Sequence, residues 1–133
     1  MPYLLDTNAW IEYLRDPASR VAQRLASHPA GEIFVCSIVE AELYRGALRS
    51  ARPSHHRAVV DACIATFMSY PFDGRAADAH ATIRVQLERI GLPIGPYDSM
   101  IAAIALVNGV TLVTHNTAEF SRVAGLALED WQV

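Results

Sequence analysis

Apolar residues follow two alternating patterns along the chain, namely short continuous runs and longer runs with helical spacing. The short runs are typical of strands buried on both faces of a parallel sheet, and the longer runs are typical of helices packed against such a sheet. The extended segments expected from this pattern are 3–5, 33–36, 68–72, 110–114 and 127–129. The helical segments expected are 8–15, 18–27, 37–49, 54–67, 74–90, 97–107 and a short turn or helix at about 118–123.

Helix and strand alternate throughout, which predicts parallel strands joined by right-handed crossovers. We therefore expect an α/β fold with three layers, α/β/α, around a central parallel sheet of about four or five strands. The 133 residues suit one compact domain spanning 1–133. Sheets of this kind bind ligands at the carboxyl ends of their strands.

The helix expected at 37–49 begins with Ser37 and has Glu40 three residues later, which is the spacing of a capping box. This pattern predicts a structural role for Glu40 at the start of the helix. Residues two apart on a helix point about 200° away from each other, so Glu42 cannot share a face with Glu40. Glu42 lies instead beside the apolar stripe that begins at Val39, and it is the better functional candidate.

The segment 99–118 contains no Asp, Glu, Lys or Arg, and it is rich in apolar residues. We interpret it as a buried helix followed by a buried strand and not as a membrane span, because Asn108 and Gly109 divide it. The N-terminus does not resemble a signal peptide, since Asp6 follows a very short apolar run without a basic flank. We therefore expect a cytoplasmic protein whose isolated Cys36 and Cys63 are buried structural residues.

The amino-acid composition excludes several classes of binding protein and enzyme. The chain is 52% hydrophobic with a net charge of −3, which argues against disorder and against a strongly basic nucleic-acid binder. Any contact with RNA or DNA must therefore be local. All 11 basic residues are Arg, and the absence of Lys excludes a P-loop lysine, a Schiff-base lysine and a Ser–Lys pair.

Acidic residues follow several of the expected strands. Asp6 ends the first strand, Glu42 lies on the helix after the second, and Asp98 begins a later helix. Asn116 and Glu119 follow the fourth extended segment. Because the carboxyl ends of parallel strands meet at one edge, we expect these side chains to converge. At an effective dielectric near 20, two carboxylates about 4 Å apart repel by about 4 kcal/mol, and a hard divalent cation is the usual means of neutralising them.

Each acid alone also has an ordinary structural explanation. Asp6 could cap the helix that begins near residue 8. Asp98 could be a first-turn carboxylate favoured by the helix dipole, and Glu42 could be a solvated helix residue. The combination of all three is what favours a metal site.

Five ordered segments contain these acids and their neighbours, and they span almost the whole chain: 5–8, 37–47, 95–102, 113–120 and 128–131. Together they resemble the PIN-domain ribonucleases, specifically the VapC-type toxins of bacterial toxin–antitoxin pairs. By this resemblance Asp6, Glu42 and Asp98 take the acidic catalytic positions, with Asp6 and Asp98 as direct metal ligands. Asn116 stands where many PIN domains have Asp, and the nearest acid is Glu119.

The resemblance implies hydrolysis of an RNA phosphodiester that depends on Mg²⁺, or alternatively on Mn²⁺, and leaves a 5′-phosphate and a 3′-hydroxyl. The expected substrate is a structured RNA such as tRNA. Thr7, Asn8 and Thr114 match polar positions that would fix the carboxylates, although they could also cap helices and loops. We hypothesise that Glu42 orients or deprotonates the attacking water.

The resemblance also implies partners, namely a VapB-type antitoxin, a second copy of the chain in a homodimer, and a hetero-oligomer with the antitoxin. The C-terminal segment of the antitoxin would lie across the acidic groove and insert an Arg among the acids. Apart from the resemblance, residues on or after the helix expected at 37–49 could form a local basic lip that holds the RNA backbone, namely Arg45, Arg49, Arg52, His55, His56 and Arg57. For the two His residues a solvated helix face is the more ordinary explanation.

Other functions stay open on the sequence. A catalytically inactive PIN-like module that binds RNA or protein is an alternative, because Asn116 brings no charge, and divalent-metal binding would separate the two. A haloacid-dehalogenase-like phosphatase needs an Asp where this chain has Asn8, and it usually needs a Lys. A flap-cutting nuclease needs duplex-gripping elements for which 133 residues leave no obvious room.

Overall fold

Five parallel strands form the centre of the molecule in the computed structural model, which describes residues 2–133. The strands are β1 (Tyr3–Leu5), β2 (Ile33–Cys36), β3 (Met68–Tyr70), β4 (Thr111–Val113) and β5 (Leu128–Glu129). Their order is β3-β2-β1-β4-β5, and every neighbouring pair is parallel. The α/β prediction with a parallel sheet is confirmed.

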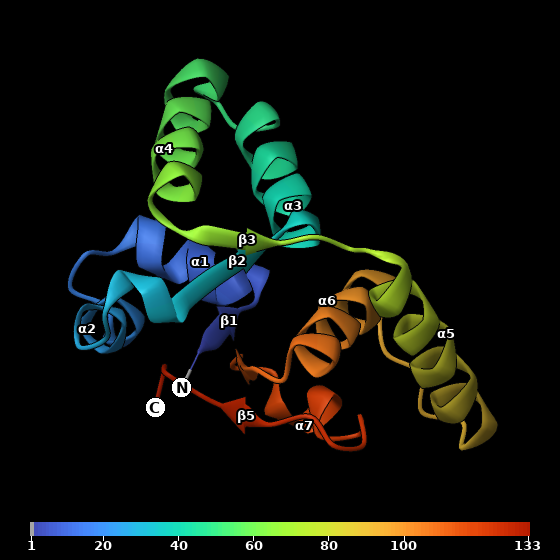
Figure 1. Cartoon of the computed structure of the whole chain (residues 1–133). Coiled ribbons are helices and arrows are strands. Elements are labelled where there is room, and N and C mark those ends of the chain that lie inside the picture. The colour runs from blue at the N-terminus through green and yellow to red at the C-terminus, as the bar shows by residue number, and fades with distance from the viewer. Residues whose placement is uncertain (1) are drawn as a thin grey trace.

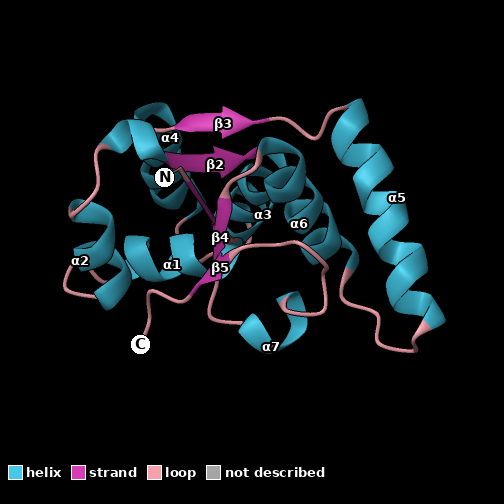
Figure 2. Cartoon of the chain, turned by 60° about the horizontal axis from the view of Figure 1, so that its bottom comes forward, coloured by secondary structure: helices cyan, strands magenta, loops and turns pink. Residues whose placement is uncertain are grey.

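Within residues 2–133, seven α-helices and one short 3-10 helix flank the strands. Figures 1 and 2 show their arrangement. The helices are α1 (Thr7–Arg15), α2 (Arg20–Ala26), η1 (Ala30–Glu32), α3 (Ser37–Leu48), α4 (Pro53–Thr66), α5 (Gly74–Arg89), α6 (Pro96–Asn108) and α7 (Thr117–Phe120). Figure 1 shows that α3 and α4 form a pair that extends away from the sheet, while α5 and α6 pack side by side. The expected helices are present, and most of their ends differ from the prediction by only one or two residues.

The strand β1 is central because its side chains are apolar on both faces. Leu4 and Leu5 are fully buried, and Tyr3 pairs with Ile33 of β2 and with Thr111 of β4. The residue that follows β1 therefore emerges at the middle of the carboxyl edge of the sheet.

The uncharged segment is mostly core as far as Thr114, as predicted, whereas His115, Asn116 and Ala118 at its end are exposed. Residues 101–105 of α6 are fully buried, and β4 continues the buried segment. Between them, Gly109 has a φ of 63°, the left-handed conformation that ends α6 and turns the chain into β4. No helix within residues 2–133 has both the length and the apolar character needed to cross a membrane.

The predicted capping box at the start of α3 is wrong. Cys36 is the N-cap residue and makes no side-chain cap, because β2 runs directly into the helix and places Ser37 inside its first turn. The Ser37 hydroxyl instead accepts a hydrogen bond from the Phe72 N–H (3.0 Å), and the Glu40 carboxylate accepts one from the Ser69 hydroxyl (2.7 Å). Glu40 does have a structural role, but that role is to tie α3 to β3.

Both cysteines are buried and unpaired, as expected from their isolation in the sequence. Burial raises the pKa of the Cys36 thiol to about 11, and it has the same effect on Cys63. Neither thiol is a reactive nucleophile at neutral pH.

Candidate active site

Asp6 lies at the centre of the carboxyl edge, where β1 ends and α1 begins. Its side chain is only 5% exposed, and its Oδ1 accepts a hydrogen bond from the Ala9 N–H (2.9 Å), so it does cap α1. Burial raises the pKa of Asp6, and the negative charges of Glu42 and Asp130 raise it further, while hydrogen bonds with Thr114 and Ala9 lower it. The helix-cap role and a role in an acidic site therefore coexist in one carboxyl group.

Asp98 occupies the first turn of α6 and is partly buried. Burial raises its pKa to about 6, and the negative charges of three other carboxylates contribute in the same direction. These carboxylates belong to Asp6, Glu42 and Glu119. The fold thus brings together acids from four distant parts of the chain.

Glu42 lies in the second turn of α3 and is partly buried. The Thr7 hydroxyl, from the first residue of α1, donates a hydrogen bond to Glu42 Oε1 (2.5 Å). The carboxylate is therefore held across two elements, and Glu42 is not simply a solvated helix residue.

Polar residues after β4 complete this edge. The Thr114 side chain is 1% exposed, interacts with the Asp6 carboxyl group and accepts a hydrogen bond from the Asn116 N–H (3.0 Å). The Asn116 amide donates to Glu119 Oε2 (3.0 Å). The side chain of Asn116 therefore holds the acid that stands three residues further on, and it is the charge of Glu119 that acts on Asp98.

Asp130 is an additional acid that was not among the predicted site residues. It follows β5, its side chain is 16% exposed, and its charge raises the pKa of Asp6. Its Oδ2 is 2.9 Å from His115 Nδ1, and its Oδ1 accepts a hydrogen bond from the Gln132 N–H (2.9 Å). The segment 128–131 was noted in the sequence, but only the pairing of β5 with β4 brings Asp130 to the site.

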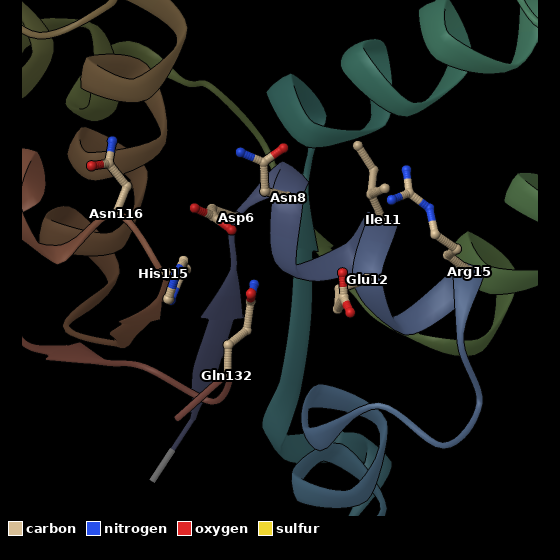
Figure 3. A pocket seen from close by; sticks show the side chains of 8 residues that line it. All are labelled: Asp6, Asn8, Ile11, Glu12, Arg15, His115, Asn116 and Gln132. Carbon is tan, nitrogen blue, oxygen red and sulfur yellow. The ribbon is translucent and has the colours of Figure 1, made fainter.

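Two hollows border the acids. A cavity of about 420 Å³ opens beside Asp6 and Asn8, between α1 and the segments that follow β4 and β5 (Figure 3). A groove of about 560 Å³ runs between α1, α3 and α4, and its walls include Leu14, Leu43 and Val60. Glu42 lies in this groove, so both hollows contain a proposed catalytic carboxylate.

The donor set fits a hard cation, because every candidate ligand is a carboxylate oxygen. Within residues 2–133, no group of three or more His, Cys, Asp or Glu side chains is arranged so as to hold a metal ion. Mg²⁺ commonly takes only one or two carboxylates and keeps several waters, which is the pattern that Asp6 and Asp98 could supply. A cation there would also reduce the repulsion that raises the pKa of Asp98.

Only some residues of the predicted basic lip are available to bind RNA. Arg57 lies 3.8 Å from Asp61 and 4.3 Å above the Tyr44 ring, so its charge is already used locally. His55 and His56 line the apolar groove. Arg45, Arg49 and Arg52 are exposed, and their contact with RNA stays a prediction.

Comparison with known proteins agrees with this geometry. A family model described as "PIN domain" matches residues 3–126. The chain is 36% identical to "tRNA(fMet)-specific endonuclease VapC" of Shigella flexneri and 34% identical to "Ribonuclease VapC2" of Haemophilus influenzae, and each match covers 98% of both chains. The fold matches the solved structure of DNA-bound VapBC from Salmonella typhimurium with a TM-score of 0.92 and 35% identity, over 98% of both chains. The chain therefore belongs to the PIN-domain family and, within it, to the VapC proteins.

Proposed function

We propose that this protein is a metal-dependent endoribonuclease and the toxin of a type II toxin–antitoxin pair. The observation that supports this most directly is the convergence of Asp6, Glu42 and Asp98 at one sheet edge, where burial raises the pKa of Asp98 to about 6 and repulsion by the neighbouring carboxylates adds to the effect. The names of its relatives as ribonucleases and endonucleases support the same activity. We expect it to act in the cytoplasm.

The substrate that we propose is a structured RNA, with tRNA as the first candidate, because the Shigella relative is named for tRNA(fMet). A Mg²⁺ or Mn²⁺ ion, when bound, would make water more acidic and would stabilise negative charge developing on the phosphate. Asp6 and Asp98 would hold the ion. The expected products are a 5′-phosphate and a 3′-hydroxyl.

Glu42 would accept the proton of the attacking water. Its carboxylate is fixed by the hydrogen bond from Thr7, which leaves the other oxygen of the carboxylate available to the water. Glu119 would add negative charge at the position where many relatives have Asp, and Asn116 would hold Glu119 in place. In this proposal Asn8 positions the substrate, and Thr114 positions the Asp6 carboxyl group.

The proposed partner is a VapB-type antitoxin. An apolar segment of the antitoxin would occupy the groove between α1, α3 and α4, and a basic side chain from it would reach Glu42 at the groove and neutralise the acids. Two relatives were solved as VapBC complexes bound to DNA, which supports an antitoxin partner and a larger assembly. We also expect a homodimer within that assembly. In such a complex the antitoxin would block both substrate and metal.

The decisive experiment is cleavage of total cellular RNA by purified, antitoxin-free protein with Mg²⁺ or Mn²⁺ and then with EDTA. The Asp6→Asn variant is the critical comparison, because Asn caps helices as well as Asp does and α1 should stay intact. Asp16→Asn is the matched control at the other end of α1, where an exposed Asp accepts a local backbone hydrogen bond.

Discrete fragments with 5′-phosphates that disappear with EDTA and with Asp6→Asn, but not with Asp16→Asn, are the expected result. An absence of cleavage by well-folded wild-type protein in both metals would instead favour the inactive binding module.

A further inference from the structure

The cavity beside Asp6 has two opposite walls. Figure 3 shows Asn8, Ile11 and Arg15 along α1 on one side, and His115 and Asn116 on the other. The metal-site candidate Asp6 lies between these walls. Anything bound in this cavity would therefore lie next to the reacting phosphate.

Arg15 is the cation available on the α1 wall. It is the last residue of α1, it is exposed, and it forms no ion pair with any residue between 2 and 133. Some arginines are engaged, since Arg24 is 3.5 Å from Glu129 and Arg75 is 3.6 Å from Asp73. What distinguishes Arg15 from the exposed arginines without an ion pair, such as Arg20, is that it borders this cavity. A guanidinium without a carboxylate partner, close to several acids, is suited to a phosphate group, which it can bind through two hydrogen bonds.

His115 supplies an oriented polar group on the opposite wall. Its Nδ1 lies 2.9 Å from Asp130, which fixes the ring and leaves Nε2 available to a ligand. Although the ring itself is 61% exposed, Asp130 is only 16% exposed and is held in turn by the Gln132 N–H. A mobile surface histidine would not have such support.

The remaining walls are polar and include the acid Glu12 on α1, whose negative charge Arg15 must also offset, and the space is small. The side-chain amides of Asn8 and Gln132 border the cavity and make no hydrogen bond with the described part of the chain. A volume of about 420 Å³ is at the lower end of the range of small-ligand sites. The neighbouring groove, which Ile11 and Arg15 also border, is larger and more apolar, and it therefore suits a protein helix better than a nucleotide.

We infer that this cavity binds one nucleotide of the substrate RNA, adjacent to the bond that is cut, with Arg15 on its phosphate and His115 on its sugar or base. This inference rests on the proposed function and specifies where the RNA lies. The acids repel the RNA backbone, so a cation at the far end of the cavity from Asp6 offsets that repulsion. Ile11 gives the sugar or base an apolar contact.

The test measures binding separately from cleavage. A fluorescently labelled RNA hairpin with a single-stranded loop of mixed sequence is titrated with protein in EDTA, over a series of salt concentrations. Arg15→Gln should weaken binding about tenfold and reduce the slope of log K against log salt by about 0.7, the value for one phosphate contact on a single strand. His115→Ala should weaken binding, and His115→Gln, which keeps a hydrogen-bond donor, should restore part of it.

Arg20→Gln is the matched control, because Arg20 is an exposed helix residue that does not border the cavity. Its affinity for RNA should be close to that of the wild type, with only the small decrease that follows from removing one positive charge. Equal affinity and equal slope for Arg15→Gln and wild type would overturn the inference, and so would a wild type that does not bind RNA.

Cleavage with Mg²⁺ separates this inference from the proposed function. Arg15→Gln should raise KM and leave kcat nearly unchanged, because Arg15 binds a neighbouring nucleotide and not the reacting atoms. If the wild type cleaves RNA but Arg15→Gln binds RNA with normal affinity, the proposed nucleotide site is wrong and the proposed endoribonuclease activity is supported. If RNA binding depends on Arg15 but no metal supports cleavage, the nuclease proposal fails.

Discussion

Thr7 and Asp6 are neighbours in sequence but serve the site in different ways. The Asp6 carboxyl group caps α1 and faces the other acids, while the Thr7 hydroxyl reaches across to Glu42. A single turn between β1 and α1 therefore sets the positions of two carboxylates. At the residue scale, the candidate site depends on these short hydrogen bonds as much as on the acids.

Glu42→Gln should slow metal-dependent cleavage by about 10² to 10⁴-fold, because the amide cannot accept the proton of water. The Thr7 hydroxyl can still donate to the amide oxygen, so the fold should be unchanged. Initial rates on one identified RNA substrate would measure the effect. Glu40→Gln is the matched control on the same helix, since Glu40 bonds Ser69 and not the site. Full activity in Glu42→Gln would remove this role.

Asp98 should make the metal-free protein less stable as pH rises. Its folded pKa of about 6 lies above its ordinary value of 3.8, so the native state binds more protons between these values, and the free energy of unfolding falls as pH rises through this window. Asp98→Asn should stabilise the metal-free protein by about 1 kcal/mol at pH 7, after allowance for solvent screening and the favourable helix dipole. Near pH 4 the difference should vanish.

Urea unfolding at both pH values, without added metal, measures this difference. Asp78→Asn on the exposed face of α5 is the control and should show no such pH-dependent gain. A wild type more stable than Asp98→Asn at pH 7 would show that the acids do not repel one another as described.

At the element scale, two glycines in helices should respond to alanine in opposite directions. Gly109 ends α6 with a φ of 63°, so Gly109→Ala should destabilise the protein by about 1 kcal/mol. Gly46 lies inside α3, and Gly46→Ala should stabilise it by about 0.5–1 kcal/mol. At both positions an added Cβ has no atom within 4 Å, so crowding does not contribute. Thermal unfolding of both variants checks the signs, and a loss of stability in Gly46→Ala would contradict this explanation.

Helix and strand positions were predictable because the apolar period changes clearly between elements. The start of α3 was misread because Ser37 and Glu40 have the spacing of a capping box but bond to residues about 30 positions later in the chain. The spacing of residues within one helix contains no information about the strand β3, which supplies one of these partners and ends shortly before the other. The helix itself was predicted correctly because that prediction depended on the periodicity of the apolar residues and not on the cap.

At the scale of the whole molecule, the pattern predicted a parallel sheet but not the order of its strands. Asp6, Glu42 and Asp98 could be predicted as candidates because Asp6 follows a strand, Asp98 begins a helix and Glu42 lies near the start of a helix that follows a strand. Asp130 was not identified as a site residue, because its approach to Asp6 depends on β5 pairing beside β4. Residues positioned by the edge strand require the three-dimensional structure.

Divalent metal should stabilise the folded molecule. At Mg²⁺ about 100 times its Kd, the free energy of unfolding should rise by about 2.7 kcal/mol, because the unfolded chain does not assemble the acids. Thermal unfolding with and without Mg²⁺ measures this rise. It should be lost in Asp6→Asn and retained in Asp78→Asn. Equal stabilisation of Asp6→Asn and wild type would place the ion elsewhere.

The central position of β1 has a consequence for the order of synthesis. Asp6 leaves the ribosome more than 100 residues before Val113, yet its N–H bonds to the carbonyl of Val113, and β1 pairs with β4. Chains emerge from the N-terminus, and contacts this distant in sequence form late. The growing polypeptide therefore cannot assemble its acids until the segment up to β4 has left the ribosome. Until then, the nascent chain carries the acids without the sheet that gathers them.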